Sequence, residues 1–152
     1  MQTKVERSKS VGYIDIRVFA HATENEAKVE TATKNLFPAE LTESIVFEKN
    51  LLSGHHSNPI IILTAKLSDR KLLPVALERL GANLSAIDKE QLNENIKLHL
   101  EKSNLYLRFD KQSAFLGQPK LTQTDPIHLK IHFKDKTSDE VVQLVRQFGL
   151  LP

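Results

Sequence analysis

The chain has 152 residues, of which 21 are Lys or Arg and 19 are Asp or Glu, giving a formal net charge of +2. This length predicts one domain spanning 1–152, with 1–10 as a flexible or edge segment, and the absence of cysteine excludes disulfides, thiolate metal sites and cysteine nucleophiles. The polar start of the chain and the shortness of the apolar run that begins at Ile60 predict a cytoplasmic protein without membrane contact.

The first elements predicted are a strand and a helix. Residues 11–20 are rich in β-branched and aromatic side chains and alternate in part between apolar and polar, which favours a strand. Thr23 and Glu26 have the spacing of a capping box and predict the start of a helix, which Pro38 ends.

A β-hairpin is predicted next. Residues 44–52 and 60–67 read as strands, and the intervening residues 53–59 are dense in turn formers. The continuous apolar start of the second strand predicts a central position with burial on both sides.

Two helices follow the hairpin. The first is expected to open at Ser68 and Asp69, to carry Pro74 in its first turns and to end at Gly81. The second is expected to run from about residue 85 to 102.

The last third predicts three strands and a final helix. Residues 105–110 and 127–134 alternate clearly, and residues 113–121 are expected to pair back as a short irregular strand. A second capping box, Thr137 with Glu140, predicts the last helix, which Gly149 closes.

The predicted order is therefore β-α-β-β-α-α-β-β-β-α. Short connections between strands favour a mainly antiparallel sheet, with helices packed on one face. We therefore expect an α+β fold whose other sheet face remains in water.

The water-facing side of the predicted sheet concentrates positive charge. We assign ten outward positions to it, of which five are Lys or Arg and one is acidic: Tyr13, Asp15, Arg17, Lys66, Tyr106, Arg108, His128, Lys130, His132 and Lys134. Cations at strand spacing can meet successive phosphates, and the two tyrosines can stack on exposed bases. The alternative is a solvated sheet face, on which Lys is also common because it blocks edge pairing.

Two polar loops are further candidates. His55, His56 and Asn58 lie in a turn that could present donors to a phosphate, or that is only a polar hairpin turn. The turn after Arg108 could contact phosphate through Lys111 and read a base edge through Gln112, or be a charged turn without a ligand.

Catalysis is not predicted. No phosphate-binding glycine loop, zinc-protease helix or nucleophile elbow appears in the sequence. A nuclease or phosphoesterase would have to use His21, His55, His56 and Asp69, which lie in separate segments without a known spacing. We therefore expect no enzyme, no metal and no cofactor.

Two stretches resemble a known family. The segment Leu105–Ala114, and the turn from Gly54 to Pro59 followed by Ile60–Leu63, are similar to motifs of an archaeal family of predicted exosome-associated RNA-binding proteins. The resemblance spans nearly the whole chain and implies a fold like that of the large-subunit ribosomal protein that binds 5S ribosomal RNA. It favours six functional residues: Arg108, Lys111, Gln112, His55, His56 and Asn58.

The function predicted is non-catalytic binding of structured RNA, mainly through the RNA backbone. The resemblance adds exosome or ribosome-related proteins as partners and RNA processing as the setting. The alternative is a protein-interaction subunit or homodimeric scaffold without direct RNA contact, for which the weakly basic pI of about 8.8 leaves room.

Overall fold

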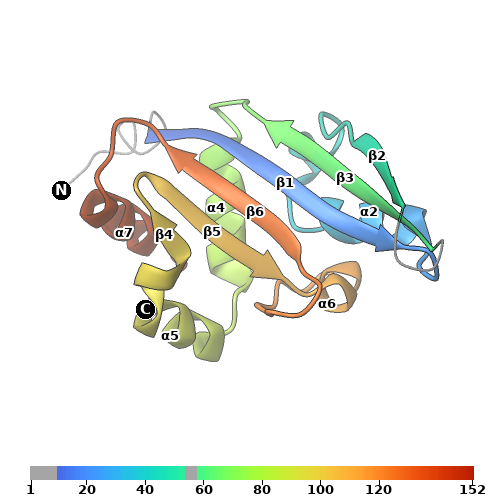
Figure 1. Ribbon diagram of the computed structural model, residues 1–152. Coiled ribbons are helices and arrows are strands. Elements are labelled where there is room, and N and C mark those ends of the chain that lie inside the picture. Colours follow the sequence, from blue (N-terminus) through green and yellow to red (C-terminus); the bar gives the residue numbers. More distant parts are fainter. Residues whose placement is uncertain (1–9, 54–57) are drawn as a thin grey trace.

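A computed structural model describes residues 10–53 and 58–152 and shows one antiparallel sheet with helices on one side (Figure 1). This confirms the predicted α+β class. Within the described ranges, no helix combines the length and apolar character needed to cross a bilayer.

The sheet has six strands in the order β2-β3-β1-β6-β5-β4, and every pairing is antiparallel. The strands are β1 (Val11–His21), β2 (Glu48–Ser53), β3 (Pro59–Leu67), β4 (Leu100–Glu101), β5 (Asn104–Phe109) and β6 (Ile127–Phe133). Strands β2 and β4 are therefore the two edge strands of the sheet.

The helices of the described residues connect these strands. They are α2 (Glu26–Lys34), α3 (Ala39–Thr42), α4 (Leu73–Asn83), α5 (Ala86–Glu94), the 3-10 helix η2 (Ile96–His99), α6 (Lys111–Phe115) and α7 (Ser138–Gln147). Helices α2, α4 and α7 lie behind the sheet in Figure 1, so the opposite face of the sheet is left without a helix over its centre.

The core lies between these helices and the sheet. In strand β6, buried and half-buried residues alternate, as the sequence predicted, so one side of the strand faces the helices. Its buried side chains are Ile127, Leu129, Ile131 and Phe133. The buried stripe of α7 meets the same core, and its residues are Val141, Leu144 and Val145. The capping box of Thr137 and Glu140 at the start of α7 is also confirmed.

The first helix begins later than the sequence predicted. Asn25, not Thr23, is the N-cap of α2, and its side chain accepts a hydrogen bond from the backbone N–H of Lys28. The Glu24 carboxylate accepts from the backbone N–H of His21. Asn is as good a cap as Thr or better, so the cap nearest the helical stripe prevails.

The predicted strand over 113–121 is wrong. The Asp110 side chain accepts hydrogen bonds from the backbone N–H and the hydroxyl of Ser113, and this cap starts the short helix α6 instead. The chain then returns to β5 only through a single bridge between Leu121 and Phe109.

Gly81 does not end its helix, which runs on to Asn83. Gly81 is buried where α4 crosses the C-terminal turn, and a Cβ at this position would lie 2.4 Å from the carbonyl oxygen of Phe148. The glycine is needed for close approach of two backbones and not for a turn.

Three further boundaries differ. The strand predicted from residue 44 begins only at Glu48, and the helix predicted over 85–102 ends at Glu94 and continues as η2 and β4. The start of β3 is half-buried and not buried on both sides, because the helices cover only one face of the sheet (Figure 1).

Candidate nucleic-acid interface

Cross-strand pairing places the predicted cations in rows across the helix-free side of the sheet. In the first row, Arg17 of β1 and Arg108 of β5 both pair with His128 of β6. Directly paired residues point to the same face, and strands are about 4.8 Å apart, so the two arginine Cα atoms lie roughly 10 Å apart. This spacing leaves room for an anion over His128.

The second row lies two residues further along the strands. Asp15 pairs with Lys66 on one side and with Lys130 on the other, and Lys130 pairs with Tyr106. Tyr13, followed by smaller contributions from Tyr106 and Asp15, raises the pKa of the Lys130 ammonium above its ordinary value. Lys130 is therefore charged throughout the physiological range.

We call this surface the open face. It is made of Arg17, Lys66, Tyr106, Arg108, His128, Lys130 and His132, with Tyr13, Asp15 and Glu48. In the described part of the chain, none of its four Arg and Lys side chains forms an ion pair. The positive charge of the open face is thus available to a ligand.

The two tyrosines of the open face have different surroundings. The Tyr13 ring stacks on His132, with ring centres 4.8 Å apart, and the Lys66 ammonium lies 4.2 Å from its centre. His132 is itself held by a hydrogen bond of 2.8 Å between Nδ1 and Oδ1 of Asn104. Tyr13 is therefore engaged within the protein, whereas Tyr106 has no ring or cation contact among the described residues and is the better stacking surface.

His128 is kept neutral by its position. Burial lowers its pKa below the ordinary 6.5, and the positive charges of Arg17 and Arg108 lower it further. An anion placed over the first row would offset the positive charges of Arg17 and Arg108, which are the second cause of the lowered pKa. His128 would then gain a proton more easily and add a third positive charge to the row.

The centre of the open face is hollowed. A depression of about 500 Å³ lies over both rows, with Arg17, Lys66, Tyr106 and Lys130 in its lining. Glu48 at the β2 side is a second carboxylate beside Asp15, which the sequence prediction did not count. The two carboxylates thus lie on β2 and β1, while the four cations are spread over four neighbouring strands: Lys66 on β3, Arg17 on β1, Lys130 on β6 and Arg108 on β5.

Lys111 and Gln112 are not part of the open face. Both lie in α6 and line a separate depression together with residues of α2, among them Lys28 and Val29. The Lys111 ammonium is bonded to the Phe19 carbonyl oxygen at 2.6 Å, to Glu24 at 3.0 Å and to Asp125 at 2.9 Å.

These contacts give Lys111 a structural position, and its predicted contact with phosphate stays a prediction. Gln112 is exposed beside Lys111 in α6, and its predicted contact with a base edge also stays a prediction.

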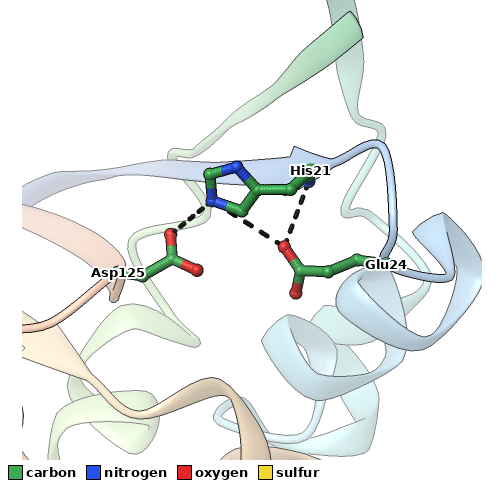
Figure 2. A group of neighbouring side chains, drawn as sticks. All are labelled: His21, Glu24 and Asp125. Atoms are coloured by element: carbon green, nitrogen blue, oxygen red, sulfur yellow. Dashed lines mark hydrogen bonds and ion pairs between the residues drawn. The ribbon is translucent and has the colours of Figure 1, made fainter. Parts of the chain in front are cut away.

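His21 completes this ionic cluster (Figure 2). Its Nε2 atom lies 3.0 Å from Oδ1 of Asp125 and 3.9 Å from Oε1 of Glu24. Burial alone would raise the pKa of Asp125, but hydrogen bonds from Lys111 and His21 outweigh it and lower the pKa below 3.8. The imidazole and the two carboxylates have metal-ligating atoms within 4.8 Å of one another. The Lys111 ammonium already supplies the cation between the two carboxylates, so the cluster is complete without a metal ion.

The histidine turn is only partly described. Asn58 is exposed and directly precedes β3, while His55 and His56 lie outside the described residues. Their predicted contact with phosphate stays a prediction.

Sequence reasoning missed the polar side chains that border the open face beyond β5. Gln91 lies in α5, Asn95 joins α5 to η2, and His99 ends η2, while Gln123 comes from the segment before β6. No local pattern marks them, because only the packing of these segments against β5 brings them together.

The fold and the open face define an α+β domain that presents a cationic antiparallel sheet to its surroundings. Comparison of sequences then gives the family. The chain belongs to the protein family described as RNA binding, whose model matches residues 13–133.

Three relatives support this assignment. The chain is 35% identical over 140 residues to RNA-binding protein PAB1135 of Pyrococcus abyssi, covering 89% of this chain and 91% of the relative. It is similar to the solved structure of Mth689, a DUF54 protein from Methanothermobacter thermautotrophicus, with 27% identity, a TM-score of 0.75, and coverage of 91% and 98%. The structure of SSO0741 from Sulfolobus solfataricus, from the same family, has 26% identity, a TM-score of 0.71 and the same coverage.

Proposed function

We propose that the open face binds structured RNA, mainly through phosphate contacts, and that it does so without catalysis. The observation that supports this most directly is the row in which Arg17 and Arg108 flank His128 on a helix-free sheet, with both guanidinium groups exposed. Arginine suits this role because its planar group donates two parallel hydrogen bonds to one phosphate. The family description and the name of the Pyrococcus relative point to the same ligand.

The test is the salt dependence of binding to a labelled RNA hairpin, followed by fluorescence anisotropy. Four cations of the open face predict a slope of log K against log salt of about −3, because each neutralised phosphate contributes roughly −0.7 to −0.9. The variant Arg17→Gln/Arg108→Gln should flatten this slope by about 1.5 units.

A matched control replaces two exposed arginines outside the open face, in Arg70→Gln/Arg79→Gln. It changes the net charge equally and should leave the slope unchanged. Absence of binding at low salt, or equal slopes for both double variants, would contradict the proposal.

Recognition of the backbone also makes a prediction about sequence. Two hairpins of the same shape and different stem sequences should bind within about threefold of each other, since phosphate contacts carry no sequence information. A large difference between them would instead indicate readout of base edges.

The resemblance of the Leu105–Ala114 segment to a known family also supports a proposal about the cellular process and the protein partners. We propose on that basis that the protein is an accessory of RNA processing associated with the exosome, with a fold related to the 5S-RNA-binding ribosomal protein. Affinity capture from an archaeal extract, with and without ribonuclease, should recover exosome subunits. Capture of none would remove this part of the proposal and leave RNA binding untouched.

One observation favours the alternative of a protein-interaction subunit or homodimer. Edge strand β2 carries Leu51, which is 71% exposed, and it follows Val46, which is 80% exposed. Exposed apolar side chains beside a sheet edge are typical of strand addition by a second chain. Light scattering measures the oligomeric state. A wild-type dimer that the variant Leu51→Lys converts to a monomer would favour this alternative.

A further inference from the structure

A second hollow lies beside the open face, between β5 and the α5–η2 segment. It has a volume of about 390 Å³, within the range of about 300–1,000 Å³ usual for small-molecule sites. We call it the amide-lined hollow, because its lining includes the carboxamides of Gln91, Asn95 and Gln123. Tyr106 lines both this hollow and the central depression, so the two adjoin at its side chain.

The carboxamides offer the chemistry of a base edge. Each carries an N–H donor and a C=O acceptor side by side, the arrangement that pairs with nucleobases. Asn95 donates its amide N–H to the backbone carbonyl of Gln91 at 3.0 Å, which leaves its own carbonyl oxygen to accept. The side-chain amides of Gln91 and Gln123 are exposed and form no hydrogen bond within the described ranges, so all their donors and acceptors are available.

The walls of the hollow are fixed and suited to stacking. His99 Nδ1 lies 2.9 Å from the carbonyl oxygen of Tyr106, so a hydrogen bond ties η2 to β5. Tyr106 and Arg108 both line the hollow. A phenol ring and a guanidinium plane are the two surfaces on which single RNA bases stack in proteins.

Arg108 links the open face to the amide-lined hollow. Arg108 belongs to the first row of the open face and also lines the amide-lined hollow. A nucleotide whose phosphate meets Arg108 therefore has its base within reach of the hollow. A base paired inside a helix cannot enter, because its edge is occupied by its partner and its faces are stacked.

We infer that the amide-lined hollow accepts one unpaired nucleobase of an RNA whose phosphates lie on the open face. This inference rests on the proposed function of that face and narrows the ligand to structured RNA with a bulged or looped-out nucleotide.

The test uses two RNA hairpins that differ by one nucleotide. One has a fully paired stem, and the other carries a single bulged 2-aminopurine, whose fluorescence reports stacking. The wild-type protein should bind the bulged hairpin about tenfold more tightly, since stacking of one base is worth about 1–3 kcal/mol. Binding should also quench the 2-aminopurine emission.

The variant Gln91→Ala/Gln123→Ala removes two carboxamides and leaves the stacking surfaces of Tyr106 and Arg108, so it should reduce this preference by about threefold or more and keep the affinity for the paired hairpin. Both residues are exposed, so the fold is expected to be retained. The matched control, Gln143→Ala/Gln147→Ala on α7, should behave as wild type. Equal affinities for the two hairpins, or a preference that is undiminished in the Gln91→Ala/Gln123→Ala variant, would overturn the inference. If binding depends on Arg17 and Arg108 but shows no preference, the proposed function stands and the inference falls. If neither hairpin binds at low salt, both fall.

Discussion

Replacement of Lys111 by methionine should destabilise the protein without weakening its RNA contact. The Lys111 side chain is 12% exposed, while its partners Glu24 and Asp125 are 28% and 40% exposed. Exposed ion pairs contribute about 0–1 kcal/mol, and removal of one partner from a buried pair costs about 3–5 kcal/mol. Since this cluster lies between those cases, we expect Lys111→Met to lower the free energy of unfolding by about 2 kcal/mol.

Urea denaturation and thermal melting measure this loss. For a chain of this size, about 2 kcal/mol corresponds to a fall in Tm of roughly 4–8 °C. Lys120→Met is the matched control, because Lys120 is exposed and forms no ion pair within the described ranges. The second change Asp125→Asn should restore part of the stability of Lys111→Met, because it removes a carboxylate that has lost its cation.

The loss should also depend on pH with a defined sign. Asp125 has a folded-state pKa below 3.8, so its share of the stability is present above that value and is lost as pH falls through the lower, folded-state pKa. The difference between wild type and Lys111→Met should therefore shrink in strong acid. A variant as stable as wild type at pH 7 would refute the reasoning, and a salt slope reduced by about one unit would show that Lys111 contacts phosphate after all.

Three further predictions concern separate parts of the chain. Gly81→Ala should destabilise the fold by roughly 1–2 kcal/mol in urea titrations despite the better helix propensity of alanine, because its Cβ would meet backbone; equal or greater stability would contradict the packing described. Thr137→Ala should cost about 1 kcal/mol through loss of the α7 cap, whereas Thr124→Ala, in an exposed loop, should cost less; the same melts decide. RNA affinity should rise as pH falls from 8 to 5.5, by at most about tenfold per pH unit for one proton, because burial and the charges of Arg17 and Arg108 lower the pKa of His128 and a bound phosphate offsets those charges. Anisotropy titrations of His128→Gln should show a weaker pH dependence, and an unchanged one would count against this role.

The sequence predicted those features of the sheet that depend on residues close together in the chain. Alternation in β6 depends only on neighbouring residues, and so does the choice of which β6 side chains face the helices. The open face followed from that alternation repeated over several strands. Its rows could not be predicted, because the pairing of Arg17 and Arg108 with His128 depends on strand register and order.

The position of Lys111 shows the limit of such reasoning. Its ammonium is held by Phe19 and Glu24, which lie 92 and 87 residues away in the sequence. A lysine in a polar turn has the same local pattern whether it faces solvent or closes a cluster. The prediction that Gly81 ends its helix was wrong for the same reason. The backbone that leaves no room for a Cβ at this position belongs to the C-terminal turn, which is distant in the sequence.

The placement of the two tyrosines gives the protein a built-in optical probe. The chain contains two tyrosines and no tryptophan. Tyr13 pairs with His132 and Tyr106 with Lys130, two β6 residues on the same side of the sheet. The tyrosine emission of the unlabelled protein therefore originates entirely from this surface. Any molecule that settles there should alter that emission, while one that docks against the helices should leave it nearly constant.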